Sequence, residues 1–350
     1  MKKVKVFLKK MLGEQKINLI KNFFDRIGRI FIKGLSPFVI PIMKFMATSG
    51  EGTETCLKNG FLPVLVHFYQ PIPNILDLEK RKVWDKESKL GGINFEPEKY
   101  LEFIKQISRE FNQECNWPNE PSKDPKQFHL HNGCFSYGCA APLHCIIRQN
   151  KPKRIIEIGS GNSSKVIAAA IELNGSQNHK TQYTIIDPYS ILEPKNFPKN
   201  TNIIRQNVEL IELKLFESLE ANDILFIDSS HVCKIGSDVN FEILEILPLL
   251  NIGVLIHFHD INIPYEYPKI YATNPKFRVF WNESYLLQAF LICNSEFEII
   301  LPMDYLQRNF LEDLKSFFPL STGTNFGWVS GSFWIKRILK HVKKNKSSKV

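Results

Sequence analysis

The sequence lacks the marks of a secreted or membrane-spanning protein. Its seven cysteines are an odd number, and no two of them form a C-x-x-C pair. This argues against a disulfide framework or a zinc site and favours reduced thiols in the cytoplasm. The N-terminus has no clean apolar core with a cleavage site, as a secretory signal requires. We also expect no membrane-spanning helix, because charged residues interrupt the N-terminal apolar run and Pro37 and Pro41 break it.

The sequence also lacks basic character outside its two ends. The net charge is +9, but residues 1–46 alone hold eleven Lys or Arg against two acidic residues, and residues 336–350 hold seven against none. The body of the chain is therefore negative and has no need of a polyanionic substrate. No aromatic stacking motif accompanies the basic ends, so we expect no specific binding to nucleic acid.

The N-terminal 50 residues mix lysines with Phe and Ile at roughly helical spacing. We expect a basic amphipathic extension over residues 1–50, and a helix of this kind suits peripheral contact with an anionic membrane through residues 1–46. Such contact would place the protein at the inner membrane surface. The alternative is a solvated or partner-packed helix. At the other end, residues 338–350 are expected to form a basic, disordered tail.

The most specific local signal is the segment KRIIEIGSG at residues 153–161. Its isoleucines form a short apolar strand that is typical of a buried parallel sheet. Gly159 and Gly161 then allow the backbone to turn tightly and to approach a ligand. A helical segment, SSKVIAAAIEL, follows at residues 163–173. A strand, turn and helix in this order bind nucleotides.

Two features favour S-adenosylmethionine over a dinucleotide. Ser164 stands where the dinucleotide fingerprint has its third glycine. Glu157 lies within the strand end, where a carboxylate is costly unless it meets a cation or hydrogen-bond donors, and the ammonium group of a methionine moiety supplies both. Asp187 follows the second strand and is placed to accept both ribose hydroxyls. The alternative for Asp187 is a turn residue, because Pro188 follows it.

With these residues the chain resembles the class I S-adenosylmethionine-dependent methyltransferases. Glu157, Gly159 and Gly161 match their first motif, acidic-x-Gly-x-Gly, and Asp187 matches the acidic residue after their second strand. The resemblance implies that Ser160 and Asp228 also belong to the cofactor site.

Further phrases resemble a bacterial group of the methyltransferase-24 type. They are HFYQPIP (67–73), DILFIDSSH (223–231), LIHFHDI (255–261), WNESYLLQAFL (281–291) and SFW (332–334). The resemblance therefore covers roughly residues 61–337.

The alternation of strands and helices predicts a doubly wound, Rossmann-like α/β sheet. The resemblance implies seven strands, the last two antiparallel, together with a helical N-terminal accessory region. We expect the cofactor-binding domain at residues 151–337 and an accessory or cap region at 61–150. The expected strands lie near residues 154–158, 183–187, 202–206, 223–228, 253–258, 297–301 and 332–336.

Acidic residues and histidines follow the fourth and fifth expected strands. Asp228 ends the fourth strand with His231 three residues later, and His259 and Asp260 end the fifth. Ligands bind beyond the carboxyl ends of the strands in open α/β sheets, so we expect these side chains to face one pocket. There His231 or His259 is a candidate general base for an acceptor hydroxyl, oriented by Asp260 or Asp228.

Asp228 and Asp260 are also a candidate metal site. Two facing carboxylates repel one another unless a cation or a proton lies between them. Such hard oxygen ligands suit Mg²⁺, which lowers the pKa of a bound hydroxyl. The layout is similar to that of catechol O-methyltransferase, which has acidic ligands after the same two strands. This chain departs from that pattern with His259 before Asp260.

The sequence thus predicts a cytoplasmic S-adenosylmethionine-dependent methyltransferase. It is expected to methylate a hydroxyl of a small molecule or a glycan by in-line transfer, and the glycan is implied by the resemblance rather than by any residue. Three alternatives stay open: an NAD-dependent oxidoreductase on the same sheet, a non-catalytic adaptor at the membrane surface, and an enzyme that binds the same cofactor but performs other chemistry. The sequence gives no prediction of the oligomeric state.

Overall fold

The structure, a computed structural model, describes residues 2–320 and 330–339, with side chains from residue 26 onward. The chain divides into two compact units, Met1–Leu78 and Glu79–Val350. This boundary falls inside the expected accessory region at residues 61–150, and residue 151 does not begin a separate unit. From residue 340 onward, the expected C-terminal tail lies outside the described residues.

In the first unit, helix α1 (Lys2–Ser49) is continuous and contains both Pro37 and Pro41. The expectation that these prolines break the helix is therefore wrong. A proline removes one backbone hydrogen bond and kinks a helix, but the residues on either side can remain helical. The segment Arg26–Ser49 is long and apolar enough to cross a membrane by length and composition, with a mean hydropathy of 1.5. Length and composition therefore do not support the expectation of no membrane-spanning helix. Helix α2 (Thr53–Lys58) follows.

The second unit is built on a seven-stranded sheet with the order β3-β2-β1-β4-β5-β7-β6. Strands β1 to β5 pair in parallel, whereas β7 runs antiparallel to both β5 and β6. The predicted seven strands and the antiparallel end are confirmed. The strands are β1 (Arg154–Ile158), β2 (Gln182–Ile186), β3 (Thr201–Ile204), β4 (Ile224–Ile227), β5 (Leu255–Phe258), β6 (Phe297–Pro302) and β7 (Phe333–Arg337).

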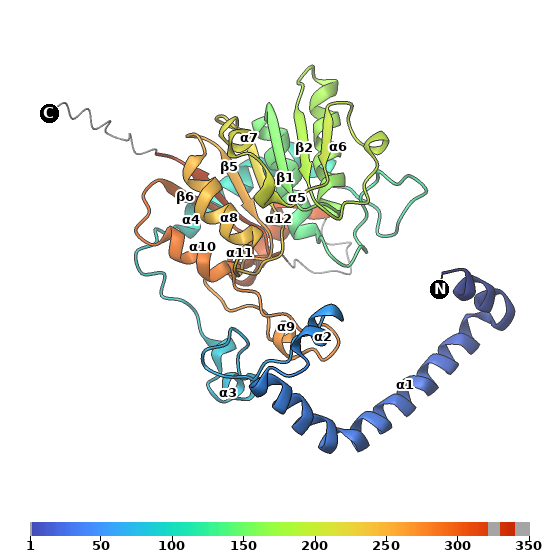
Figure 1. Ribbon diagram of the computed structural model, residues 1–350. Coiled ribbons are helices and arrows are strands. Elements are labelled where there is room, and N and C mark those ends of the chain that lie inside the picture. The colour runs from blue at the N-terminus through green and yellow to red at the C-terminus, as the bar shows by residue number, and fades with distance from the viewer. Residues whose placement is uncertain (1, 321–329, 340–350) are drawn as a thin grey trace. The chain divides into compact units, whose positions relative to one another are not determined.

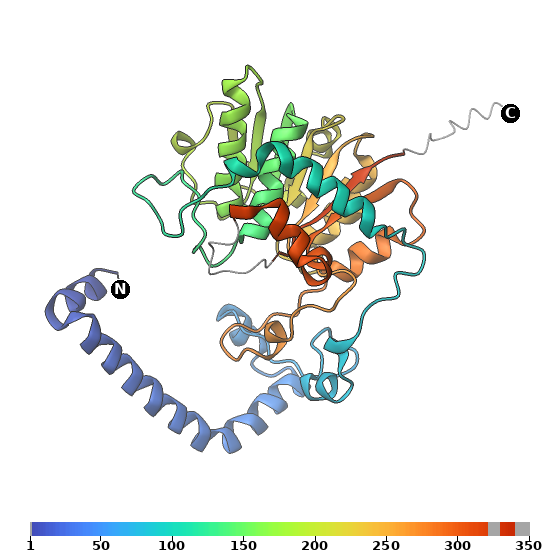
Figure 2. The same cartoon turned by 180° about the vertical axis from the view of Figure 1, so that it is seen from behind.

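Helices cover both faces of this sheet (Figures 1 and 2). One layer contains α4 (Pro97–Phe111), α5 (Tyr137–Asn150), α6 (Asn162–Ser176) and α12 (Leu311–Phe317). The other contains α7 (Leu213–Glu217), α8 (Asp238–Phe241), the π-helical segment η5 (Glu242–Ile246) and α10 (Glu283–Leu291). The remaining α-helices are α3 (Ile75–Lys80), α9 (Lys269–Thr273) and α11 (Met303–Asn309). The short 3₁₀ turns are η1 (Val83–Asp85), η2 (Asn112–Glu114), η3 (Pro194–Asn196), η4 (Val208–Leu210) and η6 (Leu247–Leu249).

The two helical layers explain why the strands read as continuous apolar runs. All four residues of β4 (ILFI) and of β5 (LIHF) are buried, as a parallel sheet covered on both faces requires. Helix α4 adds Tyr100, Ile104 and Ile107 to the same core. This part of the expected accessory region therefore belongs to the sheet unit.

The strand order places the turns after β1, β2 and β4 next to one another. The order reverses between β1 and β4, which is the point where open α/β sheets bind ligands. Backbone hydrogen bonds continue past the strands here: Gly159 N donates to Ile186 O, and Asp228 N donates to Ile158 O, both at 2.9 Å. The turns that follow these strands are thus fixed to the sheet edge.

Candidate functional site

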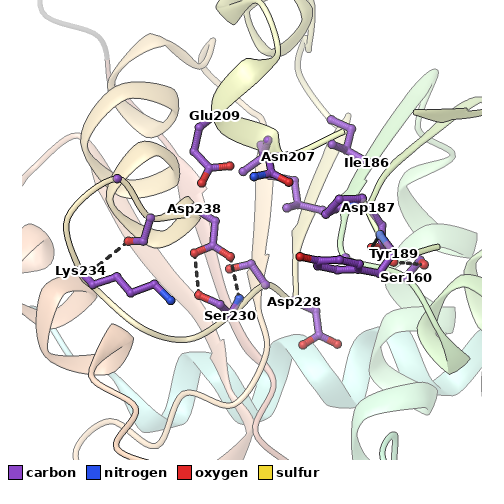
Figure 3. A pocket seen from close by; sticks show the side chains of 17 residues that line it. Ser160, Ile186, Asp187, Tyr189, Asn207, Glu209, Asp228, Ser230, Lys234 and Asp238 are labelled. Carbon is purple, nitrogen blue, oxygen red and sulfur yellow. Dashed lines mark hydrogen bonds between the residues drawn. The ribbon is translucent and has the colours of Figure 1, made fainter. Parts of the chain in front are cut away.

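A cavity of about 560 Å³ opens at the carboxyl ends of β1, β2 and β4 (Figure 3). This volume lies within the range of about 300–1,000 Å³ that is usual for small-molecule and cofactor sites. Figure 3 shows Ser160, Asp187 and Tyr189 on one side of the cavity, with Ser230 and Asp238 opposite. The lining also includes Ile158, Gly159, Ile186, Pro188, Asn207, Val208, Glu209, Asp228, Ser229, Lys234, Gly236 and Ser237.

Most of the predicted cofactor residues line this cavity. Gly159, Ser160, Asp187 and Asp228 are among the lining residues, whereas Glu157 and Gly161 are not. The hydroxyl of Ser160 donates a hydrogen bond to one oxygen of Asp187, and the backbone N–H of Tyr189 donates to the other at 2.8 Å. Asp187 therefore shapes its own turn and also lines the cavity, so the two interpretations of this residue are compatible.

Glu157 does not line the cavity and is fully buried. Its carboxylate accepts hydrogen bonds from Ser163 Oγ at 2.7 Å, from Ser164 Oγ at 2.8 Å and from the hydroxyl of Tyr183. Burial raises the pKa of Glu157 to about 7, although these three hydroxyls act to lower it. The side chain ties β1, β2 and the start of α6 together. Its expected contact with a ligand ammonium group stays a prediction.

The two predicted glycines differ in how strictly the fold requires them. Gly159 has φ +84, and a Cβ atom there would lie 2.0 Å from the backbone oxygen of Asp228. Gly161 has an extended backbone, with φ 170, and a Cβ atom there would meet no atom within 4 Å. Of these two glycines, therefore, only Gly159 is required by the protein's own packing.

Four charged side chains meet at the ends of β4 and β5: Asp228, His231, His259 and Asp260, called the His–Asp cluster below. His231 Nε2 lies 3.4 Å from Asp228 Oδ1 and 3.7 Å from Asp260 Oδ2. His259 Nδ1 lies 3.6 Å and 3.4 Å from the same two oxygens. The structure thus brings together all four residues that the strand ends indicated. Asp228 belongs to both the cavity and the cluster.

The backbone is strained at two positions of the cluster. His231 has φ 60 and Asp260 has φ 56, in the left-handed region that residues other than glycine seldom adopt. Such conformations cost on the order of 1–3 kcal/mol each and persist only where the surroundings enforce them. Glycine at residue 331 leaves room for this turn, because a Cβ atom there would lie 2.7 Å from Asp260 Cα.

The cluster carries charges of both signs. Burial acts to lower the pKa of His231, but Asp228 and Glu283 outweigh it and raise that pKa to about 10. Burial also opposes the charged form of His259, yet Asp228 and Asp260 raise its pKa well above the usual value. Burial acts to raise the pKa of each aspartate, but the two histidines hold both values below the usual range. Near neutral pH, two imidazolium ions therefore face two carboxylates.

These charges bear on two of the predicted roles. A protonated imidazole cannot accept a proton, so His231 or His259 would have to lose its proton before it could act as the predicted general base. That role stays a prediction. The positive charge expected between Asp228 and Asp260 is supplied by these imidazolium ions. Over the part of the chain with described side chains, no group of three or more His, Cys, Asp or Glu residues is placed to hold a metal ion. The Mg²⁺ site predicted at the pair Asp228 and Asp260 stays a prediction.

Glu283 is a site residue that the sequence analysis missed. It begins α10 and is 1% exposed. Its Oε2 atom lies 2.8 Å from His231 Nδ1, and the ring of Trp281 lies 4.4 Å from the ring of His231. The phrase WNESYLLQAFL marked this helix, but nothing local in the sequence connected it with His231.

Comparisons with known proteins indicate the family of this chain. Residues 156–261 match the family model described as a methyltransferase domain. A protein of Archaeoglobus fulgidus, described as uncharacterized, is 31% identical over 184 residues, which cover 50% of this chain and 80% of that protein. The chain belongs to the class I S-adenosylmethionine-dependent methyltransferases. The oxidoreductase and adaptor alternatives gain no support from these matches.

Solved methyltransferase structures are more distantly similar to this methyltransferase. An apo structure of CmcI is 17% identical with a TM-score of 0.34, over 58% of this chain and 71% of that chain. The O-methyltransferase from Bacillus cereus in complex with SAH is 12% identical with a TM-score of 0.28, over 68% and 91% of the two chains.

The two glycines of the first turn provide a matched pair of variants. In Gly159→Ala the new methyl group meets the Asp228 carbonyl, so we expect a loss of about 1–3 kcal/mol in the free energy of unfolding. The free energy of unfolding of Gly161→Ala should lie within about 0.5 kcal/mol of the wild-type value. Chemical denaturation of both variants measures the difference. Equal stability of the two would contradict the described contact with Asp228.

Proposed function

We propose that this methyltransferase transfers a methyl group to a hydroxyl of a small-molecule or glycan acceptor. The observation that carries the proposal is the double position of Asp228, which lines the cavity and belongs to the His–Asp cluster. A cofactor in the cavity and an acceptor at the cluster would therefore meet at one carboxylate. The glycan class rests on the resemblance of the sequence alone.

The cavity offers the groups that the cofactor needs. Asp187 is placed to accept hydrogen bonds from the ribose hydroxyls, and the turn at Gly159 and Ser160 allows close approach of its backbone. When bound, S-adenosylmethionine supplies a methyl group activated by its sulfonium leaving group. The protein therefore has two remaining tasks, which are to align the acceptor oxygen and to remove its proton.

Asp260 is the proposed proton acceptor, through Oδ2. Its carboxylate is ionised at neutral pH because its pKa lies below the usual value, held there by the two histidines against the effect of burial. A weak base is sufficient here, since an attacking hydroxyl becomes strongly acidic as its oxygen forms a third bond. His231 and His259 keep the carboxylates ionised and fixed in place. No metal-dependent step is part of this proposal.

Glu283 is proposed as the residue that positions His231. It accepts a hydrogen bond from Nδ1, which fixes the ring so that Nε2 faces the two aspartates. Buried charge pairs of this kind depend on both partners, because removing one leaves the other charged and unpaired.

We also propose that the protein acts in the cytoplasm. Its seven cysteines are an odd number without a C-x-x-C pair, which is typical of reduced thiols.

Asp187 and Asp260 should separate cofactor binding from turnover. Asp187→Ala removes the acceptor for the ribose hydroxyls, so S-adenosylmethionine should bind more weakly by about 1–3 kcal/mol. Asp260→Asn should bind the cofactor like the wild type and lose turnover. Calorimetry measures the first quantity, and release of S-adenosylhomocysteine the second.

The same calorimeter decides the proposal as a whole. The wild-type protein should take up S-adenosylmethionine and S-adenosylhomocysteine but not NAD. Absence of binding to both sulfur compounds would overturn the proposed function. Loss of turnover on addition of EDTA would contradict only the proposal that the reaction needs no metal ion.

The pH profile reports the state of His231. Its folded pKa of about 10 exceeds the unfolded value of 6.5, so protonation stabilises the fold fully below pH 6.5, and this contribution disappears as the pH rises through 10. Turnover should fall in the same range, as the carboxylates lose their imidazolium partner. Glu283→Gln removes a negative charge, so the loss of turnover at alkaline pH (the alkaline limb of the profile) should move to lower pH.

Glu283→Asp is the control, because it keeps the charge and should retain an alkaline limb closer to that of the wild type. Rates measured from pH 6 to 10.5 with all three proteins provide the comparison. An identical limb in Glu283→Gln and wild type would rule out the positioning role.

A further inference from the structure

Helix α1 exposes many large apolar side chains between Arg26 and Ser49, and none of this segment is buried. The exposed fraction of each lies between 38% and 70%. The set comprises Ile30, Phe31, Ile32, Leu35, Phe38, Val39, Ile40, Ile42, Met43 and Phe45. Exposed apolar surface on this scale marks a contact with lipid or with another protein.

The charges of this segment are all positive and lie along one side. It contains Arg26, Arg29, Lys33 and Lys44 and no acidic residue. An α-helix turns by about 100° per residue, so these four side chains fall within an arc of about 60°. Of the exposed apolar side chains, only Ile40 lies within that arc, and the others occupy the rest of the circumference. The segment is therefore amphipathic, with a narrow basic stripe and a wide apolar face.

We propose that residues 26–49 lie in the plane of an anionic membrane surface. The basic stripe would face the lipid phosphates, and the apolar face would enter the boundary between headgroups and acyl chains. This places all four cations in the polar layer, where each adds attraction to anionic lipid.

A spanning orientation fits the charges less well. Lys33 and Lys44 are about 16 Å apart along the axis at 1.5 Å per residue. Both would lie within or at the edge of a hydrocarbon core of about 30 Å, where a charged side chain is costly.

The prolines also suit a helix that keeps one side in water. Pro37 has no N–H to donate to the carbonyl of Lys33, four residues earlier. Ser36 Oγ donates to that carbonyl instead, at 3.0 Å. Lys33 belongs to the basic stripe, so in the proposed orientation this carbonyl lies on the side that water and phosphates can reach. Each step of this inference is independent of the proposed reaction.

Vesicle flotation of the full-length protein tests the proposal. The protein should bind vesicles of phosphatidylcholine with phosphatidylglycerol at least about tenfold more tightly than vesicles of phosphatidylcholine alone. The double variant K33E/K44E should lose this preference, and the matched control K33R/K44R should keep it. Phe31→Glu combined with Phe38→Glu should abolish binding to both kinds of vesicle. All variants should bind S-adenosylmethionine like the wild type, which separates this test from that of the proposed function.

Two results would overturn the proposal. If the protein bound both vesicle types equally, or did not bind the anionic vesicles, the basic stripe would have no electrostatic contact with anionic lipid. Resistance of the membrane-bound protein to alkaline carbonate extraction would indicate a spanning helix rather than one that lies in the surface.

Discussion

Two imidazolium ions paired with two carboxylates hold the functional edge of this protein together. Strands β4 and β5 are parallel neighbours, so the residues after them emerge about one strand spacing apart. Asp228 and Asp260 would repel each other in that position without a positive charge. His231 and His259 provide it from the same two loops, at 3.4–3.7 Å from the carboxylate oxygens. The strained backbone at His231 and Asp260 is one cost of this arrangement.

The cluster is continuous with the cofactor cavity through the backbone. The carbonyl of Asp228 occupies the space where a side chain at residue 159 would lie, so the first turn and the end of β4 fit only with glycine there. The side chain of Asp228 then faces the histidines. A change in the turn after β1 should therefore displace the end of β4, where the acceptor is proposed to react.

Much of this could be predicted because the signals are local. Each strand is a short apolar run between polar turns, and the residues that follow parallel strands meet at one edge, so Asp228 and Asp260 could be placed together from the sequence. Glu283 could not, because 52 residues separate it from His231 and its own surroundings are those of an ordinary helix start. The protonation of the histidines was also out of reach, since it depends on how many carboxylates face each ring. Glu157 was expected to contact the ligand. Its full burial and its hydrogen bonds to Ser163, Ser164 and Tyr183 follow from tertiary packing, which the local sequence does not reveal.

The charge state of the His–Asp cluster is the central claim, and NMR of the protein labelled with ¹⁵N-histidine tests it most directly. The account predicts that both ring nitrogens of His231 and of His259 are protonated at neutral pH, and that His231 remains so until about pH 10. Assignments follow from the loss of each signal on substitution. Neutral rings at pH 7.5, with titration near the usual 6.5, would contradict the account.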